Sequence, residues 1–194
     1  MSKRGQRVTD ASGYLLHAAA WRETSQIVQV FTRQHGTVAL VAKGAKRPYS
    51  ALRSILMAFH PLVLSWSGNS EIRTLTHVEL AGVLPLKGRA LMSAWYLNEL
   101  LLRLLPREDP HPELFDAYQT ALHHLAFDQP AASALRRFEW VLLDETGYGL
   151  EEPAPDFTDL QQEPALRASL RQRLDALLER PLQTRKVLME LQRF

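Results

Sequence analysis

Residues 25–42 read SQIVQVFTRQHGTVALVA, and this stretch decides the class of fold. Apolar and polar side chains alternate along residues 25–32, which are rich in β-branched types, so they predict a strand with one buried face. Gln34-His35-Gly36 has the composition of a tight turn, and residues 37–42 predict the next strand. The stretch therefore predicts a β-hairpin.

The same reasoning extends over the first 80 residues. Further strands are expected at residues 13–20, 61–67 and 71–80, and Ser67-Gly68-Asn69-Ser70 forms the tight connection between the last two. Five short strands with one longer irregular connection are typical of a five-stranded OB-fold β-barrel. An SH3-like barrel or a small sandwich fits the spacing nearly as well.

After Pro85 the apolar spacing changes from two to about 3.6 residues, which predicts helices. Proline and glycine set their limits at Pro106, Pro112 and Gly147. The expected helices span residues 86–105, 111–127, 131–146, 164–178 and 183–192, and the acidic, proline-containing stretch 151–164 is expected to be a linker. The fold class is thus α+β with two domains, an OB-fold domain at 1–82 and an all-α domain at 83–194.

Composition excludes several kinds of chemistry. The 194 residues are 46% hydrophobic and 23% charged, as in an ordinary globular protein, and include no cysteine. Disulfides, thiolate zinc sites, iron–sulfur clusters and cysteine nucleophiles are therefore excluded, and no cofactor or metal is expected. The apolar stretches are too short to span a bilayer and no signal peptide is recognisable, so a cytoplasmic protein is expected.

Catalytic motifs are also absent from the sequence. Gly44 lacks the spacing of a phosphate-binding loop, and the adjacent His123 and His124 point about 100° apart on a helix, which does not suit one metal ion. No Gly-x-Ser-x-Gly elbow occurs. An enzyme whose site is assembled from scattered residues stays open as an alternative; its candidates are His60, His77, Asp116 and His123.

Positive charge is concentrated near the start of the chain. Residues 1–59 hold nine Lys or Arg against two Asp or Glu, whereas residues 151–164 hold five acids and no base. Three of the cations lie within five residues, and their mutual repulsion is relieved by an anion such as phosphate. The candidate nucleic-acid-binding cations are Lys43, Lys46, Arg47, Arg53, Arg22, Arg33 and Arg73. A solvated basic face is the simpler alternative.

Aromatic residues in the same domain could stack on bases, as in single-strand binders. Tyr49 follows the basic cluster directly, and Trp66 lies beside a turn, so both are candidate stacking residues. Trp21, Phe31 and Phe59 are more readily explained as core. The same basic barrel would also serve an RNA-binding protein of ribosome assembly or translation.

Several segments resemble one family, in register along nearly the whole chain. They are Trp21-Arg22-Glu23-Thr24-Ser25, residues 38–46, Phe59-His60-Pro61-Leu62, Glu71-Ile72-Arg73-Thr74-Leu75, Tyr96-Leu97-Asn98-Glu99-Leu100-Leu101, Ala134-Leu135-Arg136-Arg137-Phe138-Glu139, Gly147-Tyr148-Gly149 and Arg180-Pro181-Leu182-Gln183-Thr184-Arg185. Together they resemble RecO, a bacterial DNA-repair and recombination mediator family.

The resemblance implies an OB-fold followed by a helical domain, and a protein that is not an enzyme. It implies binding to single- and double-stranded DNA, annealing of complementary strands, and a cytoplasmic, nucleoid-associated location. With the partner RecR, such a protein helps load RecA onto DNA coated by single-stranded DNA-binding protein (SSB). The family's basic residues correspond to Lys43, Lys46 and Arg47.

The resemblance also implies a pocket for the SSB C-terminal tail in the helical domain, at Arg136 and Arg137. The alternative for these two arginines is a helix-surface ion pair with Glu139 or another acid. Family members usually carry an additional segment after the Gly-Tyr-Gly turn, sometimes with a four-cysteine zinc site. Here an acidic stretch and one helix fill that interval, so contacts made by that segment are not expected.

Overall fold

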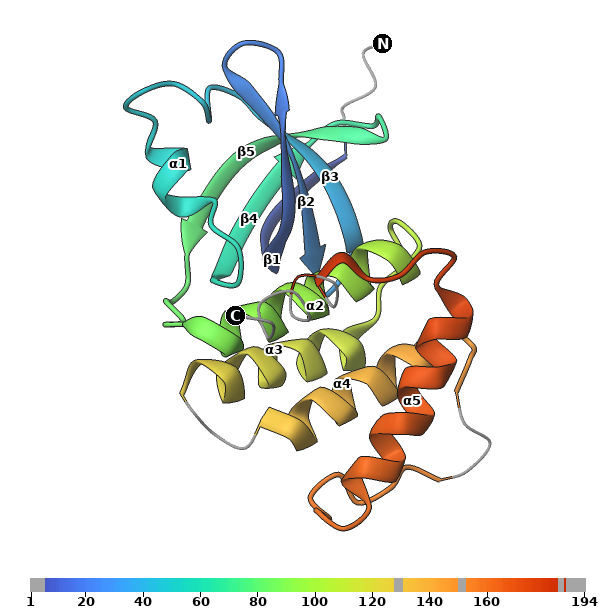
Figure 1. Ribbon diagram of the computed structural model, residues 1–194. Helices are drawn as coiled ribbons and strands as arrows, with labels where there is room; N and C mark the ends of the chain where they lie inside the picture. Colours follow the sequence, from blue (N-terminus) through green and yellow to red (C-terminus); the bar gives the residue numbers. More distant parts are fainter. Residues whose placement is uncertain (1–5, 128–130, 150–152, 185–186, 188–194) are drawn as a thin grey trace. The chain divides into compact units, whose positions relative to one another are not determined.

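Strand β1 (Arg7–Trp21) pairs along its first half with β4 (Pro61–Ser67) and along its second half with β2 (Ser25–Thr32). This double pairing closes a barrel in the order β1-β2-β3-β5-β4, with β3 (Gly36–Ala42) parallel to β5 (Ile72–Leu80) (Figure 1). The computed structural model describes residues 6–127, 131–149, 153–184 and 187. The predicted five-stranded OB-fold barrel is confirmed.

Alternation along the strands fills the barrel. Val28 and Val30 on β2, and Leu62 and Leu64 on β4, are at most 1% exposed because every second side chain points inward. The bounds predicted for β2 and β4 agree with the structure. Strand β1 begins six residues earlier than predicted, because the register shifts between Val8 and Ala11 and hides the alternation.

A short helix, α1 (Ala51–Ile55), lies between β3 and β4 and was not predicted. Five residues are too few to show a helical period. Leu52 and Ile55 are partly buried against the barrel core, so the helix covers the barrel with its apolar side chains. Arg53 stays exposed on the other side.

The chain divides into two compact units, Met1–Leu84 with Pro106–Pro110, and Pro85–Leu105 with His111–Phe194. We call Pro106–Pro110 the clasp segment. Its Glu108 N–H donates to the carbonyl of Thr37 at 3.0 Å, and the Thr37 hydroxyl donates to the carbonyl of Pro106 at 3.0 Å. The first unit is therefore completed by a segment that follows it by more than twenty residues.

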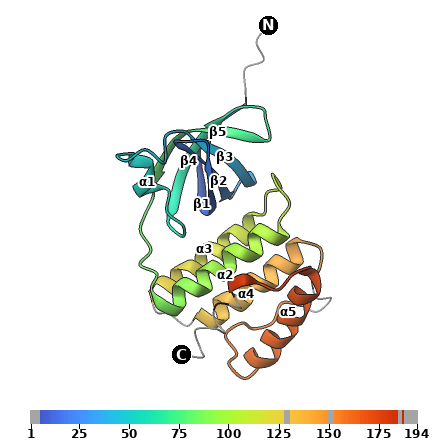
Figure 2. The ribbon, with the colours of Figure 1, turned by 45° about the horizontal axis from the view of Figure 1, so that its top comes forward.

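The second unit contains α2 (Gly88–Leu104), α3 (Pro112–Ala126), α4 (Ala131–Glu145) and α5 (Glu163–Leu177). Each of these helices packs against the next (Figure 2). Its core contains fully buried aliphatic and aromatic side chains, among them Leu97, Leu101, Tyr118, Phe138 and Leu142. The predicted all-α region is confirmed, but most of the helix expected at 183–192 lies outside the described residues.

No described helix is both long and apolar enough to cross a membrane. Within the same residues, no group of three or more His, Cys, Asp or Glu side chains is placed to hold a metal ion.

Candidate nucleic-acid interface

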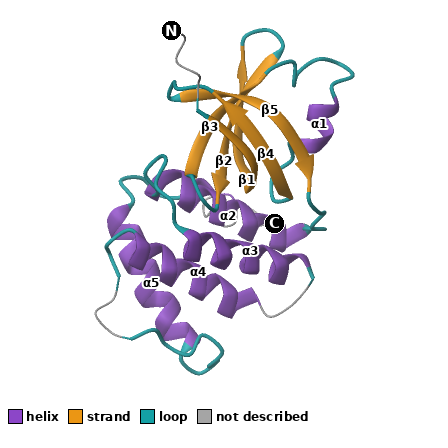
Figure 3. Cartoon of the chain, turned by 180° about the vertical axis from the view of Figure 1, so that it is seen from behind, coloured by secondary structure: helices purple, strands orange, loops and turns teal. Residues whose placement is uncertain are grey.

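Five exposed cations lie on the β1–β2 turn, on the β3–α1 connection and on α1, and we call them the basic end. They are Arg22, Lys43, Lys46, Arg47 and Arg53. Gln26 pairs with Ala42, so the β1–β2 turn and the end of β3 are neighbours. The Lys46 N–H donates to the carbonyl of Thr24 at 2.9 Å, which joins the two loops directly. Figures 1 and 3 show the β1–β2 turn and the β3–α1 connection at the same end of the barrel.

Backbone hydrogen bonds hold the β3–α1 connection in successive turns. The N–H of Arg47 donates to the carbonyl of Gly44 at 3.0 Å, and that of Ser50 to the carbonyl of Arg47 at 3.1 Å. Ala45, 1% exposed, anchors the loop in the barrel core. Gly44 has φ +73°, a conformation that glycine adopts at little cost. The lysines are therefore presented outward on an ordered loop.

Aromatic side chains flank the basic end. Tyr49 is fully exposed, and Trp21, at the last position of β1, is 42% exposed. The Arg22 guanidinium carbon lies 5.9 Å from the Trp21 ring centroid, within cation–π range. The sequence analysis identified Tyr49 as a stacking candidate but favoured a core position for Trp21. The exposure of Trp21 could have been predicted from its place directly before the Arg22-Glu23-Thr24 turn.

Trp66 is buried, so the expectation that it stacks on bases is wrong. It is 1% exposed and belongs to the barrel core. It shares the inward face of β4 with Leu62 and Leu64, four and two residues before it, and this alternation outweighs its closeness to a turn.

Arg33 lies apart from the basic end, and Arg73 is paired with an acid of the same unit. Arg33 follows β2 in the β2–β3 turn, and an eight-residue strand spans about 27 Å. The Arg73 side chain is 15% exposed, and its Nη2 lies 2.8 Å from Glu108 Oε2 of the clasp segment. Its charge is already balanced within the chain, so the expected extension of the basic surface to these two residues is corrected.

Arg136 is also engaged inside the protein. Its Nη2 donates to Glu139 Oε1 at 2.7 Å, its Nη1 to Glu163 Oε1 at 3.3 Å, and its side chain is 8% exposed. Burial raises the pKa of Glu139, and the charge of Arg136 opposes this rise. The structure thus places Arg136 in a buried ion-pair network and corrects the expected open pocket for a carboxylate. Arg137 is exposed.

The fold defines the class: a closed OB-fold barrel joined to a helical unit. Two models of one family match consecutive parts of the chain, recombination protein O N terminal at residues 7–84 and recombination protein O C terminal at 86–152. The chain belongs to the RecO family.

Its relatives carry the same family name. Over 145 residues it is 57% identical to the DNA repair protein RecO of Cupriavidus metallidurans, a match that covers 74% of this chain and 49% of the relative. It is 54% identical over 147 residues to that of an Azoarcus species, covering 75% and 60%. For Aromatoleum aromaticum the identity is 55% over 146 residues, covering 75% and 61%. The chain thus spans about half to three-fifths of the length of these curated relatives.

Proposed function

We propose that this protein acts in DNA repair by binding single- and double-stranded DNA at the basic end of its barrel. The observation that carries the proposal is the gathering of five exposed cations on the β1–β2 turn, the β3–α1 connection and α1, with the two loops joined by the Lys46 to Thr24 hydrogen bond. Neutralising phosphates releases condensed counterions, which supplies affinity without base recognition. Tyr49 adds a surface on which a base can stack.

Family membership supports the finer roles that the proposal includes. A surface that binds two strands lowers their mutual repulsion, which favours annealing of complementary DNA. With RecR, the protein would help load RecA onto single-stranded DNA coated by SSB, and the SSB tail would bind the helical unit. None of these steps breaks a covalent bond, so we propose a mediator and no catalytic activity. A faster rate of annealing of complementary oligonucleotides is the expected readout.

The first test measures salt dependence. Fluorescence anisotropy of a labelled oligo-dT strand across a salt series gives the slope of log K against log salt. The Lys43→Ala/Lys46→Ala/Arg47→Ala variant should reduce this slope by about 2, since each single-strand phosphate contact contributes about 0.7. The matched control, Arg89→Ala/Arg137→Ala/Arg171→Ala, removes three exposed cations of the helical unit and should keep the wild-type slope.

Equal losses in both variants, or none in the first, would contradict the assignment to the basic end. The same titration with RNA of matched sequence tests the alternative of an RNA-binding protein, because the 2′-hydroxyl distinguishes the two polymers. Tighter binding to RNA at every salt concentration would favour that alternative.

A further inference from the structure

A small polar cavity lies in the barrel unit, and none of its lining residues belongs to the basic end. It has a volume of about 210 Å³ and is lined by the start of β1, the β2–β3 turn, β4, β5 and the clasp segment. The lining residues that can recognise a ligand are Gln6, Gln34, His35, Arg73 and Glu108. Sites for whole drug-sized ligands have volumes of about 300–1,000 Å³. This cavity is smaller, so it suits a ligand that is smaller than a drug molecule.

The charges in the cavity select a neutral ligand. Arg73 and Glu108 are paired at 2.8 Å, so one guanidinium and one carboxylate balance each other. Burial and the nearby Arg73 lower the pKa of His35, which favours the neutral form of its ring. A phosphate would meet the Glu108 carboxylate, and a cation would meet Arg73. A neutral ring with both donors and acceptors on its edge avoids both conflicts.

We propose that this cavity binds one unpaired guanine base. The ion pair occupies one carboxylate oxygen and one guanidinium nitrogen, whereas a carboxylate has about four acceptor sites and a guanidinium five donors. Guanine carries two N–H donor groups on its Watson–Crick edge for Glu108. It also presents O6 and N7 as acceptors, the atoms that arginine recognises most often. The choice of a base as occupant rests on the proposed single-strand binding.

The cavity also has an aromatic wall. The ring of His35 meets that of Trp66 edge to face, with centroids 5.3 Å apart and planes at 83°. Trp66 is fixed in the barrel core, so it holds the orientation of the His35 ring. Histidine is among the side chains on which splayed bases stack. Trp66 therefore acts as a positioning residue, because it orients the His35 ring on which the base would stack.

The test uses the nucleoside deoxyguanosine, which has no phosphate, and the full chain. Saturation-transfer NMR should show binding of deoxyguanosine, and binding of thymidine should be weaker. Glu108→Gln turns one acceptor oxygen into a donor and should weaken deoxyguanosine binding roughly 5- to 100-fold, the discrimination that one bidentate pair supplies. Glu71→Gln is the matched control: Glu71 pairs with Arg107 of the same clasp segment but does not line the cavity.

The outcomes separate this inference from the proposed function. Absence of a deoxyguanosine signal, or equal binding by Glu108→Gln and wild type, overturns the guanine site even when oligonucleotide binding persists. Deoxyguanosine binding that is unchanged in Lys43→Ala/Lys46→Ala/Arg47→Ala supports the site even when that variant contradicts the basic end. If a thermal melt shows that Glu108→Gln does not fold, the variant Gln34→Ala, in the exposed turn, is used for the test. Unchanged affinity of this variant for deoxyguanosine overturns the inference.

Discussion

At the scale of single residues, Tyr49 allows the contribution of base stacking to DNA affinity to be measured apart from that of charge. Its side chain is fully exposed, so its removal costs the fold little. Tyr49→Ala should weaken binding of single-stranded DNA by about 1–3 kcal/mol, the contribution of one stacked base, and leave the salt slope unchanged. Tyr49→Phe keeps the aromatic face and should bind like wild type. Anisotropy titrations of both variants check this, and a phenylalanine variant as weak as the alanine variant would contradict stacking.

Arg136 contributes to the stability of the helical unit. Its replacement by alanine leaves the carboxylate of Glu139 buried, 2% exposed, without its charge partner. Breaking a buried pair from one side typically costs about 3–5 kcal/mol, so urea unfolding followed by circular dichroism should show a loss of this size. The exposed neighbour Arg137 provides the control, since Arg137→Ala should change stability by less than about 0.5 kcal/mol. Equal, small effects would place Arg136 outside any important network.

At the scale of elements, the sequence predicted the features that depend on residues close together along the chain. Strands β2 and β4 show a clear period of two, and the prolines and glycines between helices mark their ends. It could not predict the clasp segment, because the bonds of Glu108 to Thr37 and Arg73 join residues more than thirty positions apart. Gly36 belongs to the same arrangement: a Cβ there would collide with the backbone of Asp109.

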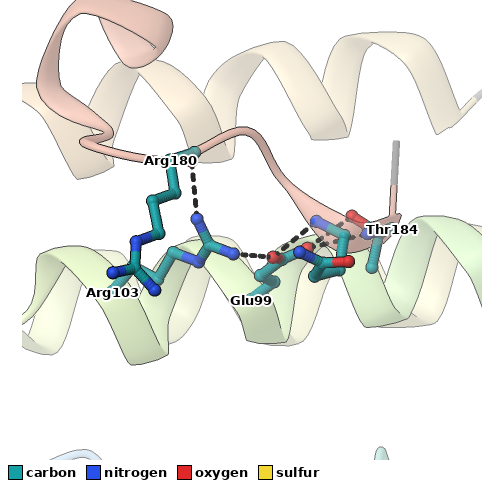
Figure 4. Close-up of polar contacts among 5 residues, drawn as sticks. Glu99, Arg103, Arg180 and Thr184 are labelled. Atoms are coloured by element: carbon teal, nitrogen blue, oxygen red, sulfur yellow. Dashed lines mark hydrogen bonds and ion pairs between the residues drawn. The ribbon is translucent and has the colours of Figure 1, made fainter. Parts of the chain in front are cut away.

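A second long-range contact fixes the segment after α5 to α2 (Figure 4). The Glu99 carboxylate accepts the N–H of Gln183 at 2.8 Å and the N–H and hydroxyl of Thr184 at 2.9 and 2.8 Å. It also pairs with Arg103, whose Nη1 donates to the carbonyl of Arg180 at 2.7 Å. One carboxylate thereby orders the segment through three donors and an ion pair.

Glu99→Gln should therefore loosen this segment. Replacing one oxygen by an amide group sets a donor against the donors of Gln183 and Thr184, so hydrogen-exchange protection of these two amides should fall roughly 10- to 100-fold. The exposed Glu113 on α3 gives the control variant Glu113→Gln, which should leave their protection unchanged. Unchanged protection in Glu99→Gln would show that another contact holds the segment.

At the scale of the whole molecule, the candidate site was predictable where it is contiguous in sequence. Lys43, Lys46 and Arg47 lie on one loop, and their shared exposure follows from their charge, because unpaired Lys and Arg side chains stay in water. The addition of Arg22 depends on the register of β2 with β3, and the pairing of Arg73 depends on Glu108 of the clasp segment. Charge counts cannot supply either fact, because they do not say which cation already has an acidic partner.

Acid should destabilise the barrel unit before the helical unit. Burial lowers the pKa of His60 below 6.5, and its Nδ1 accepts the N–H of Leu84 at 3.0 Å. The unfolded chain binds more protons in this window, so the contribution of His60 is fully present above pH 6.5 and is lost as the pH falls through the folded-state pKa. Burial by itself would raise the pKa of Glu99, but the hydrogen bonds from Thr184 and Gln183 and the charge of Arg103 lower it below 4.5. The stability contributed by Glu99 is therefore present above pH 4.5 and is lost at lower pH.

Hydrogen exchange with mass spectrometry, corrected for intrinsic rates, can follow β4 and α2 separately between pH 7.5 and 4. Protection of β4 should fall first, and that of α2 only below pH 4.5. His60→Asn keeps an acceptor for the Leu84 N–H but has no group that titrates in this range, so it should flatten the loss in β4 and leave α2 unchanged. The same acid sensitivity of β4 in this variant would assign the effect to other groups of the barrel, first of all to His35, whose pKa is also lowered by burial and by Arg73.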